Sequence, residues 1–324
     1  MGGRVEGSHP GSRGALGYSD QPTGRSEPAK QSASLVSRSL LVAFCLVAAL
    51  TYRASVSVIP SGVLEDAFVL VLSAVLLALA AFARRSDELK KFWEIPFAFF
   101  VFTLAGFFGD GSISPLQHLF VRDVLHQTTS TNNPLASTVM GTVLAQVVGT
   151  LLLAVPIIVL TRASGADLRS IFLTRSANWW GVAVGVACFV IVYFLVVRGR
   201  TASFFPTHGA VTMSRLLSLT PALVVLVLLN GFREELWFRG LFLNRYGAFL
   251  GPLSSNVLAA VIFTSFHVQV QYAASILPFL VYTLINGLIL GWLMQRSRSI
   301  LASAIFHAGT DIPIFLVYLT YAAP

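Results

Sequence analysis

Long apolar segments alternate with short polar connections along most of the chain. The hydrocarbon core of a bilayer is about 30 Å thick, so a helix needs roughly 20 apolar residues to cross it. We expect nine spans, with eight as the alternative. Their predicted ranges are 39–59, 63–83, 94–109, 136–160, 178–197, 221–246, 254–273, 276–295 and 299–321. The pattern therefore predicts an all-α fold, a polytopic transmembrane helical bundle.

Two segments outside this pattern are also informative. Residues 1–37 are rich in Gly, Ser, Pro and charged side chains and have almost no apolar periodicity, which is typical of disorder. We therefore expect a disordered cytoplasmic tail at 1–37. Residues 212–220 fit either a short interfacial helix or an extension of the sixth span.

The composition agrees with a membrane protein. Hydrophobic residues make up 55% of the chain and charged residues only 11%, against about 25% charged in soluble proteins. The net charge of +8 is explained by topology: with the N-terminus inside, 17 Lys and Arg lie inside and five outside. We expect an integral membrane protein, in the plasma membrane of a prokaryote, with a cytoplasmic N-terminus, the lipid bilayer as its surroundings and no nucleic-acid partner.

Deeply buried ionisable residues are concentrated in the last 100 residues of the chain. The acids predicted within spans are Glu234, Glu235 and Asp311, and the histidines are His267 and His307. A charged group at membrane depth costs at least a few kcal/mol, so such groups persist mainly where they pair or take part in chemistry. This concentration predicts a functional site in the C-terminal half.

Helical spacing suggests how the acids divide their roles. Glu235 and Arg239 are four residues apart and can pair on one face of a helix. Glu234 is about 100° away around the helix, so we expect one anchored carboxylate and one free carboxylate. His307 and Asp311 share a helical face for the same reason.

The depths of the three spans allow their polar residues to meet. At about 1.5 Å rise per residue, Glu234, His267 and His307 lie roughly 18, 20 and 12 Å from the ends of their spans. They can therefore share one layer of the membrane. Phe263 precedes His267 by one turn and would shield that side of the imidazole.

Three short motifs carry a resemblance to a known family. They are Glu234-Glu235-x-x-x-Arg239, Phe263-x-x-x-His267 and His307-x-x-x-Asp311. In this order they resemble the motifs of the CPBP family, the CAAX-processing and bacteriocin-processing intramembrane proteases, also called the Abi family. The resemblance covers about residues 175–321. We therefore predict N-terminal transmembrane spans at 38–174 and a CPBP or CAAX-protease-like catalytic transmembrane domain at 175–324.

The resemblance implies an intramembrane endopeptidase that hydrolyses a peptide bond in a membrane-associated protein or peptide, by CAAX-type processing or a related maturation. Glu234, helped by His267, would deprotonate a water, and His307 would stabilise the oxyanion. Asp311 would fix the tautomer or orientation of His307. In the family Asn is commoner at this last motif position, and an ionised Asp cannot donate a hydrogen bond to an oxyanion. The predicted supporting residues are Glu235, Arg239 and Phe263.

Other interpretations remain open at the level of sequence. The family is also described as metalloproteases, so Glu234, His267 and His307, with or without Asp311, could hold a zinc ion with a water in an open position. Zinc and no cofactor are both consistent with the residues. An ion- or proton-coupled transporter would also need buried acids and histidines. A catalytically inactive immunity or binding relative is the third alternative.

Overall fold

The computed structural model describes residues 2–3, 35–59, 62–111, 113–174 and 178–323. Within these ranges the structure is helical and contains no β-strand, and one isolated bridge joins Thr138 to Ala323. Residues 33–324 form one compact unit. The helices are α1 (Leu35–Val58), α2 (Val63–Arg85), η1 (Lys90–Phe92), α3 (Glu94–Gly109), α4 (Pro115–Leu119), η2 (Phe120–Val124), α5 (Val139–Ala163), η3 (Leu168–Ile171), α6 (Trp179–Val197), α7 (Met213–Glu234), η4 (Glu235–Gly240), α8 (Leu243–Leu250), α9 (Pro252–Ser265), α10 (Ile276–Ser297) and α11 (Ile300–Tyr321).

The predicted fold class is confirmed. Eight helices of the described residues are long and apolar enough to cross a membrane, with α7, η4 and α8 taken together as one of them. A helix suits this setting because all its backbone polar groups are paired within the segment. The predicted tail, 1–37, lies outside the described residues except at 2–3 and at 35–37, where α1 begins.

One predicted span is wrong in its extent. The sequence predicts a helix over 254–273, whereas α9 ends at Ser265 after 14 residues. Its last turn tightens, because the backbone N–H groups of Phe266 and His267 bond to carbonyls three residues earlier. The following segment, which contains the polar residues Gln269 and Gln271, lines a cavity. His267 therefore lies just beyond a helix and not within one.

The sixth predicted span begins earlier than expected and contains a local irregularity. α7 starts at Met213, with Thr212 Oγ1 accepting a hydrogen bond from the Arg215 N–H, so residues 213–220 extend the span. η4 is a π-helical turn, and its Leu236 carbonyl accepts from the Leu241 N–H five residues later. π-helical turns inside α-helices frequently mark functional sites.

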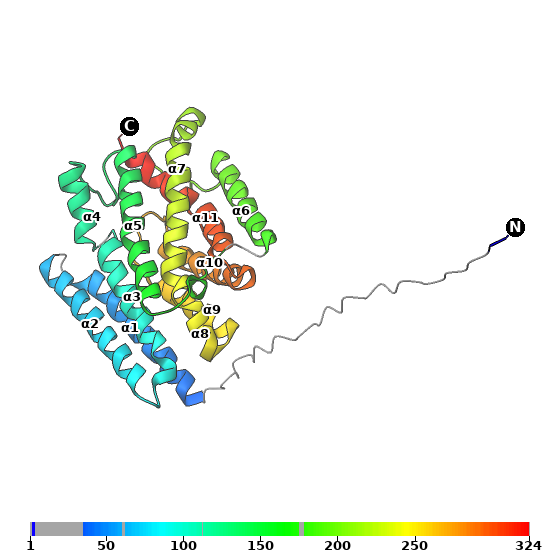
Figure 1. Cartoon of the computed structure of the whole chain (residues 1–324). Coiled ribbons are helices and arrows are strands. Elements are labelled where there is room, and N and C mark those ends of the chain that lie inside the picture. Colours follow the sequence, from blue (N-terminus) through cyan, green and yellow to red (C-terminus); the bar gives the residue numbers. More distant parts are fainter. Residues whose placement is uncertain (1, 4–34, 60–61, 112, 175–177, 324) are drawn as a thin grey trace. The chain divides into compact units, whose positions relative to one another are not determined.

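The helix at the centre of the C-terminal half is α11. Its most apolar stretch is 78% buried, against 17–50% for the other candidate spans of the described residues. It packs against α6, α7 and α10, and Figure 1 shows these helices around it. The polar residues His307, Thr310 and Asp311 of α11 are buried by these neighbours.

α7 and α11 approach each other closely at Gly231. A Cβ at this position would lie 2.5 Å from the Ala304 carbonyl oxygen and 2.9 Å from the Ala308 nitrogen, both backbone atoms of α11. Small residues allow helix backbones to come this close in membranes. The contact places the end of α7, where Glu234 lies, beside the turn of α11 that carries His307.

Candidate active site

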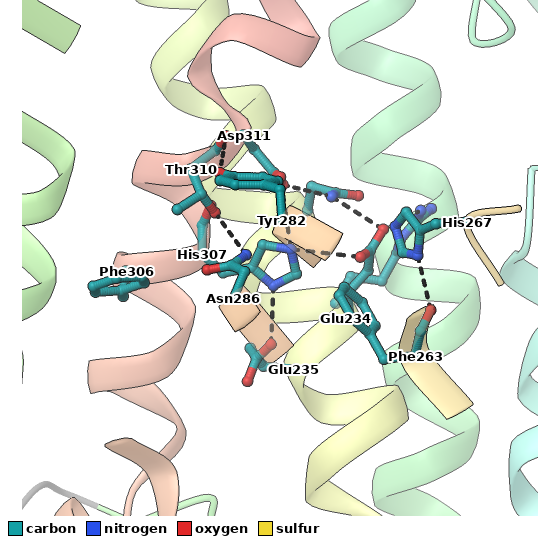
Figure 2. Close-up of polar contacts among 12 residues, drawn as sticks. Glu234, Glu235, Phe263, His267, Tyr282, Asn286, Phe306, His307, Thr310 and Asp311 are labelled. Carbon is teal, nitrogen blue, oxygen red and sulfur yellow. Dashed lines mark hydrogen bonds and ion pairs between the residues drawn. The ribbon is translucent and has the colours of Figure 1, made fainter. Parts of the chain in front are cut away.

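Five ionisable side chains from α7, η4 and α11 form one polar cluster inside the bundle. Figure 2 labels four of them, Glu234, Glu235, His307 and Asp311. Glu234 is the last residue of α7, and Glu235 and Arg239 belong to η4. His307 and Asp311 lie one turn apart on α11. The structure therefore brings together the first and third sequence motifs, which are about 70 residues apart in the chain.

The buried anchor of this polar cluster is the pair of Glu235 and Arg239. Arg239 Nη1 donates to Glu235 Oε1 over 2.6 Å, and both side chains are 0% exposed. The guanidinium carbon also lies 4.3 Å from the centre of the Phe263 ring, a cation–π contact. The predicted pairing of Glu235 with Arg239 is confirmed.

His307 is oriented by Glu235. Its Nδ1 lies 2.9 Å from Glu235 Oε1, and because an ionised carboxylate only accepts, Nδ1 donates in this bond. Its Nε2 faces Glu234 Oε2 and Asp311 Oδ1, each at 3.6 Å (Figure 2). The tautomer of His307 is therefore set by Glu235, and a role of Asp311 in orienting His307 stays a prediction. Asp311 is one turn away on the same helix and reaches only the Nε2 side, beyond hydrogen-bond distance.

Of the two adjacent glutamates, Glu234 is the one that reaches open space. Its side chain is 16% exposed, whereas that of Glu235 is fully buried. Glu234 Oε1 accepts a hydrogen bond from Asn230 Nδ2 at 3.1 Å and lies 3.9 Å from Arg233 Nη2. The arrangement agrees with the expected division into one anchored and one free carboxylate.

His267 approaches the cluster from the end of α9. Its Nδ1 lies 2.8 Å from the Phe263 carbonyl oxygen, and because a carbonyl only accepts, the neutral ring carries its proton on Nδ1. Its Nε2 is then a proton acceptor. The Phe263 ring contacts both imidazoles, with centroids 4.5 Å from His267 and 5.6 Å from His307. In Figure 2 the Glu234 carboxylate lies between the two imidazoles.

Two polar residues of the site were missed by the sequence analysis. Asn230 Nδ2 donates to Asp311 Oδ2 at 2.8 Å as well as to Glu234, and Gln146 Nε2 of α5 donates to Asn230 Oδ1 at 3.4 Å. The signal for Asn230 was its position four residues before Glu234 in an otherwise apolar run. A search for ionisable residues alone does not select uncharged amide side chains such as those of Asn230 and Gln146.

The polar cluster opens onto a cavity of about 460 Å³. Glu234, His267 and Asp311 line it, together with aromatic side chains such as Trp237 and Tyr318. The N-terminal half supplies part of the wall through residues Arg53, Asp110, Pro134, Leu135 and Gln146. The cavity is therefore lined by polar groups from both halves of the chain, with aromatic surface between them.

The zinc alternative can be tested against this geometry. A catalytic zinc site needs three protein ligands and one open position. Among the described residues, no three His, Cys, Asp or Glu side chains are arranged to hold a metal ion. His307 Nδ1 is engaged by Glu235, which leaves Nε2 as its one nitrogen available to a metal ion. The side chains as placed form no three-ligand zinc site among the described residues.

The fold and the site together define a polytopic helical membrane protein with an acid–histidine cluster facing a cavity. Residues 216–313 match the family model described as type II CAAX prenyl endopeptidase Rce1-like. The match confirms the resemblance to the CPBP family and supports an enzyme of the CAAX-protease type. No curated protein and no solved structure matches the chain.

Proposed function

We propose that this protein is an intramembrane endopeptidase that cleaves a peptide bond in a membrane-associated protein or peptide. The observation that carries the proposal is the position of Glu234. It is the carboxylate of the diglutamate pair that reaches the cavity, and it faces an imidazole nitrogen of His307 at 3.6 Å. The family match over 216–313 supports the same class of reaction.

Water activation is the first step of the proposed mechanism. A water in the cavity transfers one proton to the Glu234 carboxylate, and its oxygen attacks the scissile carbonyl carbon. The free Nε2 of His267 is a second acceptor for the water, since its Nδ1 is held by the Phe263 carbonyl. A positioned acid–base pair of this kind contributes about 10²–10⁴-fold to a rate.

The second step is collapse of the tetrahedral intermediate. His307, as an imidazolium with a proton on each nitrogen, donates a hydrogen bond from Nε2 to the oxyanion, and Glu235 stabilises this cation through Nδ1. The carbon–nitrogen bond breaks, and the proton held by Glu234 passes to the leaving nitrogen. The products are a carboxylic acid and an amine, which become a carboxylate and an ammonium ion when the acid gives its proton to the amine, and the site returns to its starting protonation state.

We further propose the type of reaction, the membrane in which it occurs and the orientation of the chain. The reaction is CAAX-type processing or a related maturation step, carried out in the plasma membrane of a prokaryote, with the N-terminus on the cytoplasmic side. The cavity is walled partly by aromatic side chains, which suits a peptide with apolar residues near the scissile bond. The mechanism uses side chains of this chain alone.

A comparison of membrane proteomes tests the proposal in cells. Membranes from cells that carry the wild-type protein are compared with membranes from cells that carry Glu234→Ala at equal abundance. We expect specific peptide products in the first sample and the intact precursors in the second. Identical peptide profiles, or substrate transport without any cleavage in the wild type, would contradict the proposed function.

A further inference from the structure

Asn230 joins the two carboxylates that line the cavity. Its amide nitrogen, Nδ2, lies 2.8 Å from Asp311 Oδ2 and 3.1 Å from Glu234 Oε1. A primary amide has two N–H bonds, so each carboxylate receives one of them. Asn230 is 7% exposed and lies on the cavity wall beside both acids.

The orientation of this amide is set from the N-terminal half of the chain. Gln146 Nε2 on α5 donates to Asn230 Oδ1 at 3.4 Å, and Gln146 is 0% exposed. This contact holds the carbonyl oxygen of Asn230 away from the two acids. Near them, the negative carboxylates would repel the partial negative charge of that oxygen. α5 lies outside residues 216–313, so a helix beyond the family match contributes to the geometry of the site.

The bond between Asn230 and Asp311 is not the main attachment of α7 to α11. The two backbones already meet at Gly231, where no space remains for a side chain beside Ala304 and Ala308. A buried amide with both donors on carboxylates is therefore better explained by the placement of those carboxylates than by helix packing.

We propose that Asn230 is a positioning residue that aims Glu234 at the reacting water, and that Gln146 holds Asn230 in the orientation this requires. The inference rests on the proposed endopeptidase function and deepens it. A Glu side chain rotates about three bonds, and a donor fixed on α7 restricts it to one arrangement. A displacement of about 1 Å at a reacting group can lower a rate by about 10²-fold. The effect falls on kcat, because Asn230 acts on a catalytic group.

An exchange of side chains separates positioning from helix attachment. In the double variant Asn230→Asp with Asp311→Asn, the bond between positions 230 and 311 is kept with its direction reversed, and the net charge is unchanged. Position 230 can then no longer donate to Glu234. The single variant Asn230→Asp lacks both donated bonds. The full-length protein, reconstituted in vesicles, is assayed with a fluorogenic membrane-anchored peptide, and melting temperatures are measured in detergent.

We expect the double variant to recover the melting temperature lost in Asn230→Asp, while its kcat stays about 10²-fold below wild type with little change in KM. Recovery of wild-type kcat in the double variant would overturn the inference, because the amide would then serve only to join two helices. Wild-type kcat in Asn230→Asp would overturn it as well.

If Asn230→Asp does not fold, a second pair of variants tests the positioning role of Asn230. Gln146→Leu removes only the bond that orients Asn230, and we expect kcat to fall about 10-fold with KM unchanged. Thr150→Val is the matched control, since Thr150 lies one turn further along α5 and its buried hydroxyl has no partner among the described residues. Equal kcat in Gln146→Leu and Thr150→Val would overturn the inference.

Glu234→Gln, assayed in parallel, separates this inference from the proposed function. If Glu234→Gln cleaves at the wild-type rate, the proposed function fails. If Glu234→Gln is inactive but the exchanged double variant is fully active, only the positioning role of Asn230 fails.

Discussion

His307 Nδ1 lies 2.9 Å from Glu235 Oε1, a contact between α11 and the π-helical turn η4. The same carboxylate oxygen receives Arg239 Nη1 at 2.6 Å. Glu235 therefore connects a buried arginine to the imidazole that faces Glu234. The second glutamate of the motif supports the histidine, while the first reaches the cavity.

The Glu235→Gln substitution tests this connection. The amide cannot carry the charge that stabilises an imidazolium at His307, so we expect kcat to fall about 10–100-fold, as for other residues that orient a functional histidine. Cleavage of a membrane-anchored peptide by protein of equal folded content measures it. Glu88→Gln, at an exposed position in the polar connection after α2, is the control. A folded Glu235→Gln protein with the wild-type kcat would contradict the role given to Glu235.

The Arg239→Ala substitution tests the anchor. It leaves the Glu235 carboxylate buried without its cation, and we expect the free energy of unfolding to fall by about 3–5 kcal/mol. Thermal and denaturant unfolding in detergent measure the change. In the control, Arg122→Ala, the ion pair with Asp123 is exposed, and no measurable loss is expected. Equal stability of the two variants would show that the buried pair does not hold η4 in place.

The Gly231→Ala substitution tests the close approach of α7 and α11. The added Cβ would meet backbone atoms of Ala304 and Ala308 at 2.5 and 2.9 Å, so the helices must separate. We expect a loss of about 1–3 kcal/mol in the free energy of unfolding, together with reduced cleavage. Gly247→Ala on α8 is the control, because its Cβ would meet only Ser255 Oγ at 3.9 Å. If both variants melt like wild type, the backbone contact is not as tight as described.

Removal of metal ions tests whether cleavage needs zinc. The proposed mechanism uses no metal ion, so we expect a zinc chelator to leave the cleavage rate unchanged. Elemental analysis of the purified protein, carried out beside the chelator titration, should find less than one zinc per chain. Loss of activity on chelation, followed by recovery on adding zinc, would contradict the metal-free mechanism.

Helix positions could be predicted largely from the sequence, because the length of an apolar run determines whether it can cross a bilayer. The span predicted at 94–109 coincides with α3, and the pairing of Glu235 with Arg239 follows from helical spacing. The extent of α9 was wrong because its last turn and the segment after it serve the cavity, and apolar length carries no information about that.

Contacts between helices could not be predicted in the same way. The bond between His307 and Glu235 depends on how α11 packs on α7 and η4, and spacing within one helix suggested Asp311 instead. Gln146 lies about 84 positions from its partner Asn230, and both are uncharged, so neither spacing nor charge marked them. Packing is what brings these residues together.

The central claim is that Glu234 activates the water that cleaves a peptide bond. Its most direct test is the single-turnover cleavage rate of a membrane-anchored peptide by purified, reconstituted Glu234→Gln protein whose melting temperature matches wild type. We expect a rate at least about 10²-fold lower than that of wild type. An unchanged rate would contradict it.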